Sequence, residues 1–155
     1  MTDLHLISRS PADTLALGER IGKAVEAGDL LALYGGLGAG KTVLVKGIVR
    51  GLGGDPDRVT SPTFVLMVRH EARLPLFHFD AYRLRDSRDM LEIGAEEVFY
   101  GDGVTVVEWA ERVQDILPSD RLDVHVDVIA ESERQVRLLA TGPRSAALLS
   151  RLQGG

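Results

Sequence analysis

A glycine-rich segment, GGLGAGKT at residues 35–42, has the residue types and the spacing needed to bind a triphosphate. It satisfies the pattern G-x-x-x-x-G-K-[ST], in which glycines let backbone N–H groups turn inward around phosphate oxygens. The lysine of this pattern reaches the β and γ phosphates, and the threonine hydroxyl binds Mg²⁺. The sequence therefore predicts a P-loop. Its candidate nucleotide-binding residues are Gly35, Gly36, Leu37, Gly38, Ala39, Gly40, Lys41 and Thr42.

Two carboxylates, Asp80 and Glu108, each stand at the C-terminal end of an apolar segment that is typical of a strand. The carboxyl ends of parallel strands meet at one edge of a sheet, beside the P-loop. A nucleoside triphosphatase needs an acidic residue there to hold Mg²⁺ and a group that orients the attacking water. Asp80 and Glu108 are therefore the candidate catalytic residues, and either could bind the metal. The structural alternative is a solvated charge at a strand end, or a helix N-cap in the case of Asp80.

Residues 60–64, TSPTF, lie between the P-loop helix and the next strand, where a nucleotide-sensing loop occurs in P-loop folds. The hydroxyls of Ser61 and Thr63 could meet the γ-phosphate or its metal. The alternative is a turn that Pro62 fixes and that serine and threonine side chains cap. Ser61 and Thr63 are therefore candidate switch residues, and both interpretations remain open.

Two further side chains are candidates for contact with a partner. Trp109, the only tryptophan, follows Glu108 directly and could anchor a partner protein or pack as a plug in the core. Arg83 belongs to a basic stretch after Asp80 and could touch phosphate or a docking partner. A solvated loop face is the structural alternative for such a run of charges.

The elements that position these residues follow from the hydrophobic pattern. Residues 29–34 and 104–108 are nearly continuous apolar runs, which are typical of strands buried on both faces of a parallel sheet. The expected strands are residues 4–8, 29–34, 64–70, 74–79, 104–108, 121–129 and 135–140, and the expected helices are residues 11–27, 41–52, 86–100 and 145–152. The sequence thus predicts an α/β fold, a P-loop NTPase-like mixed β-sheet flanked by helices in three layers.

Composition narrows the possible functions. A length of 155 residues predicts a single domain, residues 1–155, and the net charge of −5 argues against a protein that coats nucleic acid. The sequence contains no cysteine, which excludes disulfides, zinc–thiolate sites and thiol catalysis. It also contains no asparagine, which removes the guanine-reading motif common in GTPases. Neither a signal peptide nor a membrane-length apolar run is present, so we expect a cytoplasmic protein without membrane contact.

Four segments together resemble the bacterial TsaE (YjeE) family, the ATPase component of tRNA threonylcarbamoyladenosine synthesis. They are the P-loop GGLGAGKT, residues 59–64 (VTSPTF), residues 78–83 (HFDAYR) and residues 107–109 (VEW). They occur in the order of that family and near its spacings, and the resemblance covers nearly the whole chain.

The resemblance implies a Mg²⁺-dependent ATPase, slow alone, that acts with the TsaD and TsaB proteins. It is needed for threonylcarbamoyl transfer to adenosine 37 of tRNAs that read ANN codons, and it meets tRNA only through the complex. In this interpretation Thr42 and Glu108 hold Mg²⁺, and Asp80 places the metal or the water. The adenine of ATP or ADP is expected near residues 8–10 and Arg134.

Two alternatives belong to other classes of protein. A small-molecule kinase would close an arginine-rich lid over its acceptor, but no such insertion is present in the sequence. A nucleotide-gated binding module would need ATP occupancy rather than turnover. A variant that binds ATP without hydrolysing it would distinguish this module from the ATPase.

Overall fold

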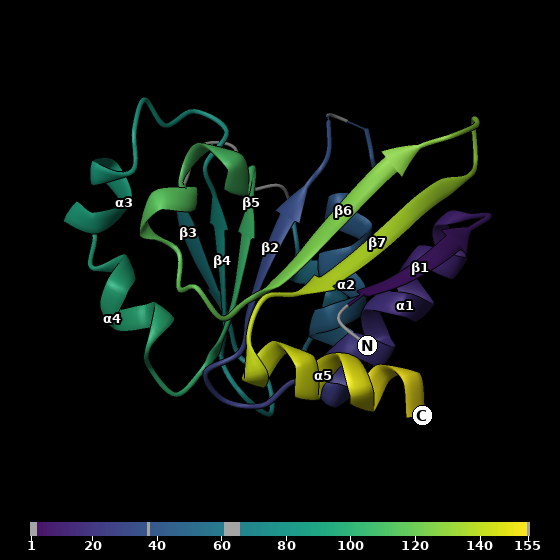
Figure 1. Ribbon diagram of the computed structural model, residues 1–155, viewed down its shortest axis with the longest axis horizontal. Coiled ribbons are helices and arrows are strands. Elements are labelled where there is room, and N and C mark those ends of the chain that lie inside the picture. Colours follow the sequence, from purple (N-terminus) through teal and green to yellow (C-terminus); the bar gives the residue numbers. More distant parts are fainter. Residues whose placement is uncertain (1–2, 37, 61–65, 155) are drawn as a thin grey trace.

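The computed structural model describes residues 3–36, 38–60 and 66–154. Within these ranges seven strands form one sheet in the order β1-β7-β6-β2-β5-β4-β3, with helices on both faces (Figure 1). The strands are β1 (Asp3–Ser8), β2 (Leu30–Tyr34), β3 (Met67–His70), β4 (Leu76–Asp80), β5 (Val104–Glu108), β6 (Leu122–Val128) and β7 (Arg134–Ala140). The α-helices are α1 (Pro11–Ala24), α2 (Lys41–Gly51), α3 (Arg88–Glu92), α4 (Ala95–Phe99) and α5 (Pro143–Gly154). Short 3₁₀ turns are η1 (Pro56–Arg58), η2 (Ala110–Arg112) and η3 (Gln114–Ile116).

The sheet is mixed, as the sequence predicts. Its centre is parallel, because β2 pairs with both β5 and β6, and β5 pairs with β4. Antiparallel pairs β1–β7, β6–β7 and β3–β4 complete the two sides. Every residue of β2 and β5 is buried, which explains their nearly continuous apolar sequences.

Two apolar cores lie on opposite faces of the sheet, which confirms the three-layer prediction. Side chains from α1, α2 and α5 pack with Leu31, Leu33 and Val106 on one face. Side chains from α3, α4 and the turns after β5 pack with Phe79 and Val107 on the other. Because residues alternate between faces along a strand, Asp80 and Glu108 lie on the same face as α2. Within the described ranges, no helix has the length and apolar content needed to cross a lipid bilayer.

Two helix predictions are wrong in detail. The first helix ends at Ala24 rather than near residue 27, because Val25 turns to an extended conformation and buries its side chain in the core. The helix expected at residues 86–100 is two short helices, α3 and α4. Gly94 separates them in the left-handed region with φ 81°. In both places a local backbone conformation ends a helix that the apolar pattern alone would continue.

The helix that follows the P-loop packs against α1 through glycines on both helices. Gly18 and Gly22 on α1 face Gly47 and Gly51 on α2. A methyl group on Gly47 would lie 2.8 Å from the Cα of Gly18 and would also contact the carbonyl oxygen of Leu15. Since both obstacles are backbone atoms, neither can rotate away. The close approach of α1 and α2 therefore depends on the absence of side chains.

We predict that Gly47→Ala destabilises the protein by roughly 1–3 kcal/mol, the usual cost of overpacking a core. Alanine ordinarily favours a helix over glycine, so the sign of the effect reports the packing. Gly154→Ala is the matched control, because among the described residues the added methyl group meets no atom within 4 Å beyond its own stretch of helix. Urea unfolding of both variants tests this, and a Gly47→Ala protein as stable as wild type would contradict the close packing.

Candidate functional site

The loop between β2 and α2 has the backbone that phosphate binding requires. Gly38 and Gly40 have φ values of 76° and 99°, which side chains rarely allow. Gly40 is also the N-cap of α2, and no side chain of the described residues caps that helix end. The first N–H groups of α2 therefore remain available to an anion, and the helix dipole favours one there.

A cavity of about 250 Å³ lies over this loop. Its lining combines the start of α2 with the end of β5, because Lys41 and Thr42 line it together with Glu108 and Trp109. The remaining lining residues are Gly36, Gly38, Ala39, Gly40 and Val43. Seven of the eight predicted loop residues fall within the described structure, and Leu37 lies outside it.

Strand register brings the two candidate carboxylates together. Asp80 is paired with Glu108 across β4 and β5, and Glu108 is paired with Leu33 of β2. Both carboxylates are buried, with exposed fractions of 9% and 3%. Oδ1 of Asp80 accepts a hydrogen bond from the N–H of Tyr82 at 2.9 Å, whereas Glu108 lines the cavity. The two side chains are neighbours with different surroundings.

Lys41 is held by the protein itself. Its Nζ donates a hydrogen bond to the carbonyl oxygen of Gly35 at 2.6 Å and lies 3.7 Å from the centre of the Trp109 ring. Burial lowers the pKa of Lys41, and the carboxylates of Glu108, Glu111 and Asp80 oppose this shift. The ammonium group therefore sits at the mouth of the loop in contact with an aromatic face, an arrangement that stabilises a cation.

Trp109 is not a fully buried plug, because part of its side chain remains exposed. It is half-buried, packs against the core on the α3/α4 face and contacts the Tyr82 ring with centroids 4.8 Å apart. Its φ of 57° makes it the only residue other than glycine in the described ranges with positive φ. Strain of this kind gathers at functional sites, and here it turns the indole toward Lys41.

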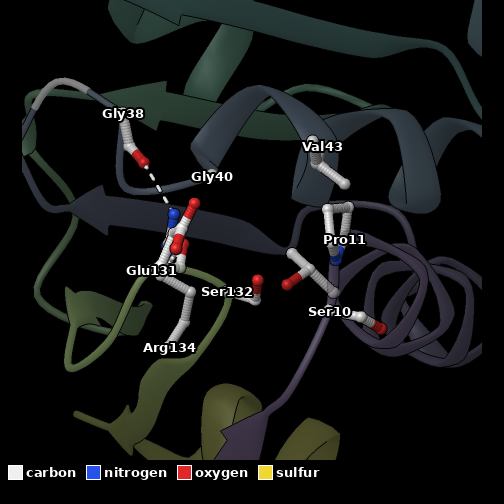
Figure 2. A pocket seen from close by; sticks show the side chains of 9 residues that line it. Ser10, Pro11, Gly38, Gly40, Val43, Glu131, Ser132 and Arg134 are labelled. Atoms are coloured by element: carbon white, nitrogen blue, oxygen red, sulfur yellow. Dashed lines mark hydrogen bonds between the residues drawn. The ribbon is translucent and has the colours of Figure 1, made fainter.

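A second cavity, of about 230 Å³, also borders the loop, since Gly38 and Gly40 line it (Figure 2). Ser10 and Pro11 line it from the start of α1, and Glu131, Ser132 and Arg134 line it from the β6–β7 turn. Arg134 donates hydrogen bonds to the carbonyl oxygens of Gly38 and Ala39, at 3.2 and 3.1 Å. This cavity thus joins the P-loop to two of the segments where the sequence places the adenine.

The remaining predicted residues are placed differently. Ser8 is buried and contacts the Thr14 hydroxyl at 2.6 Å, so its side chain serves the start of α1. Arg83 lies on the exposed loop after β4. Ser61 and Thr63 fall outside the described residues.

Sequence reasoning missed one side chain of the site. His78 is fully buried on β4, and its Nε2 lies 2.5 Å from Oε2 of Glu108. The alternation of β4 contains the signal, since His78 occupies the same face as Asp80 two residues later. A histidine on the same strand face as a candidate catalytic carboxylate therefore belongs among the candidate site residues.

The donor set fits a Mg²⁺ ion that phosphates help to bind. Thr42 and Glu108 offer a hydroxyl and a carboxylate oxygen in one cavity, and both are hard oxygen donors. Among the described residues, no group of three or more His, Cys, Asp or Glu side chains is arranged around a metal position. A self-contained metal centre would require such a group. A nucleotide-bound Mg²⁺ needs only one or two protein ligands.

Fold and site together define a class. A mixed sheet with a glycine-rich loop between its central strand and a helix is a P-loop NTPase-like fold. The crystal structure of Bacillus subtilis YdiB has the same fold, with a TM-score of 0.84 and 33% sequence identity, covering 99% of this chain and 97% of that chain.

Sequence comparisons specify the family. The family described as threonylcarbamoyl adenosine biosynthesis protein TsaE matches residues 8–136. A TsaE protein of Treponema pallidum is 42% identical over 133 residues, which cover 86% of this chain and 98% of that protein. The TsaE protein of Bacillus subtilis is 37% identical over 153 residues, which cover 98% and 95% of the two chains. The chain belongs to the TsaE family.

Burial of Asp80 yields a prediction about stability. Burial raises the pKa of Asp80, and the charge of Glu108 raises it further, while the bond from Tyr82 opposes the shift. Between the ordinary pKa and this raised value the folded state binds more protons than the unfolded state. The free energy of unfolding therefore falls as pH rises through that window, and the buried carboxyl group of Asp80 destabilises the fold at pH 7 relative to a side chain that does not ionise.

We predict that Asp80→Asn raises the melting temperature at pH 7 by roughly 2–4 °C, the equivalent of about 1 kcal/mol for a chain of this size. The gain should vanish below about pH 3, where the carboxyl group is protonated in both states. Asp89→Asn is the control, because Asp89 is exposed. A lower melting temperature for Asp80→Asn at pH 7 would show that the ionised carboxylate stabilises the fold.

Proposed function

We propose that this chain is a Mg²⁺-dependent ATPase whose active site is the cavity over the P-loop. The observation that supports this most directly is the convergence of four groups on one space of about 250 Å³. These groups are the N-terminus of α2, the Lys41 ammonium, the Thr42 hydroxyl and the Glu108 carboxylate. Each has a distinct task toward a metal–triphosphate complex.

The residues of the site divide these tasks. The loop amides and Lys41 bind the β and γ phosphates, so Lys41 leaves the Gly35 carbonyl and the Trp109 ring when nucleotide enters. Thr42 and Glu108 hold Mg²⁺, which neutralises charge on the phosphates when bound. Asp80, one strand away from the cavity lining, orients the attacking water or the metal. ATP and water are the substrates, and ADP and inorganic phosphate are the products.

The second cavity accommodates the nucleoside in this proposal. It adjoins Gly38 and Gly40, so a nucleotide whose phosphates lie in the loop can extend into it. Ser10 and the aliphatic part of Arg134 are then placed to contact the base. The five hydrogen bonds that Arg134 donates to carbonyl oxygens, two of them on the P-loop, also fix this side of the loop.

The cellular role comes from the family. The relatives in Treponema pallidum and Bacillus subtilis are named tRNA threonylcarbamoyladenosine biosynthesis proteins. We propose that this chain supplies ATP hydrolysis for threonylcarbamoyl transfer to adenosine 37 of tRNAs that read ANN codons. It does so in the cytoplasm with the TsaD and TsaB proteins and reaches tRNA only through them. The net charge of −5 supports an indirect contact with RNA.

The decisive experiment is ATPase turnover of the purified chain with Mg²⁺, first alone and then with TsaD, TsaB and tRNA. We expect feeble turnover alone and a clear increase with the partners. If the partners change nothing while a small acceptor becomes phosphorylated, the P-loop assignment survives and the ATPase role does not.

We predict that Lys41→Ala weakens ATP binding by roughly 10- to 100-fold, the effect of losing a charge-assisted hydrogen bond to phosphate. Lys46→Ala is the control, because Lys46 lies on the same helix outside the cavity lining. Calorimetric titration with ATP measures both variants. Equal affinities for wild type and Lys41→Ala would refute the site assignment.

We predict that Trp109→Ala leaves the fold intact and reduces the stimulation of turnover by TsaD and TsaB. The half-buried indole packs against the edge of the core, so its loss should lower the free energy of unfolding by only roughly 1 kcal/mol. The melting temperature should then fall by only a few degrees. A collapsed melting temperature would instead identify Trp109 as a core residue. Thermal unfolding and partner-stimulated turnover are measured on the same preparation.

A further inference from the structure

Glu108 makes a buried contact that the proposed function leaves unexplained. The side chains of His78 and Glu108 are 0% and 4% exposed, and their Nε2 and Oε2 atoms lie 2.5 Å apart. His78 precedes Asp80 by two residues on β4, so it lies further than the two carboxylates from the carboxyl edge of the sheet. The contact therefore approaches Glu108 from the side away from the P-loop.

Strand register produces this contact. His78 is paired with Val106, and Glu108 is two residues further along β5 on the same face. Diagonal neighbours of this kind are within reach of long side chains. A glutamate side chain that turns back along the strand meets the imidazole, whereas one that turns outward would not.

The tautomer of His78 sets the direction of this hydrogen bond. In the tautomer that carries its hydrogen on Nε2, His78 donates and Oε2 of Glu108 accepts. Nδ1 of His78 is buried and has no hydrogen-bond partner among the described residues. The bond to Glu108 is thus the polar interaction that the imidazole makes in the described structure, and burial shields it from competition by water.

We infer that His78 is a positioning residue for the metal ligand Glu108. The imidazole holds Oε2, so that the carboxylate keeps one rotamer and presents its second oxygen to the cavity, where the proposed Mg²⁺ binds. This inference rests on the proposed function, because it assigns His78 a task toward that cation. Partners that orient a metal ligand in this way typically contribute 10- to 100-fold to metal affinity.

A histidine that only fills space would behave differently. Its replacement would change stability, and nucleotide binding would change equally with and without Mg²⁺. A positioning residue instead affects the part of nucleotide affinity that depends on Mg²⁺. Comparing the affinity for ADP in excess Mg²⁺ with the affinity in EDTA therefore distinguishes a positioning residue from a histidine that only fills space.

The test uses three variants of the full chain. His78→Leu removes the donor, His78→Gln places an amide donor close to the position of Nε2, and His70→Leu is the control. His70 is also a buried histidine on the neighbouring strand β3, and its ring centre lies 6.2 Å from that of His78. Calorimetric titration with ADP measures each affinity, and thermal unfolding reports the fold.

We expect His78→Leu to reduce the gain in ADP affinity from Mg²⁺ by roughly tenfold or more, while the affinity in EDTA stays unchanged. His78→Gln should retain the gain to within about threefold, because the hydrogen bond is restored. His70→Leu should match wild type. If His78→Leu does not fold, a loss of Mg²⁺ dependence in the shorter variant His78→Asn, with retention in His78→Gln, supports the same conclusion.

An unchanged Mg²⁺ dependence in His78→Leu, or equal losses with Mg²⁺ and EDTA, would overturn the inference and leave the proposed function intact. Failure of His78→Gln to restore the dependence would also overturn it. If wild type itself gains no ADP affinity from Mg²⁺, the proposed function fails first and the inference fails with it.

Discussion

The site depends on the parallel register of β2, β5 and β4. Pairing of Leu33 with Glu108, and of Glu108 with Asp80, places two carboxylates beside the start of the P-loop. A shift of one residue would turn both carboxylates to the face that α3 and α4 cover, because side chains alternate along a strand. The apolar runs of β2 and β5 oppose such a shift, since both faces of each strand are buried. The same strand register therefore buries the apolar side chains of the core and places the two carboxylates.

This constraint holds the charged groups where water is scarce. Burial lowers the pKa of Lys41 and raises that of Asp80, so neither charge is favoured by its position. The protein partly compensates for the buried cation, because the Lys41 ammonium lies on the Trp109 ring. The neighbouring carboxylate of Glu108 has a contact of its own with Nε2 of His78. An unfavourable free energy at a few buried groups is typical of sites that are prepared for a charged ligand. The phosphates of a nucleotide would provide Lys41 with a better partner than an aromatic face.

Much of this arrangement could be predicted from the sequence, since it depends on local patterns. The P-loop, the buried strands and both strand-end carboxylates follow from residue types and spacing. Features that depend on distant contacts could not be predicted. Gly18 and Gly47 look like weak points of two helices until α1 and α2 are seen in contact, and Gly94 gives no sign in an apolar pattern that it splits a helix. The bond between His78 and Glu108 joins two strands whose register the sequence does not specify.

The two carboxylates, equivalent in the sequence, become distinct in the fold. Glu108 ends the strand next to β2, lines the cavity with Thr42 and has one oxygen held by His78. Asp80 is one strand further away, and its Oδ1 is occupied by the N–H of Tyr82 at the start of the loop that carries Arg83. Proximity to the P-loop strand thus supports Glu108 as the ligand of the proposed metal, and the hydrogen bond from Tyr82 connects Asp80 to the loop after β4.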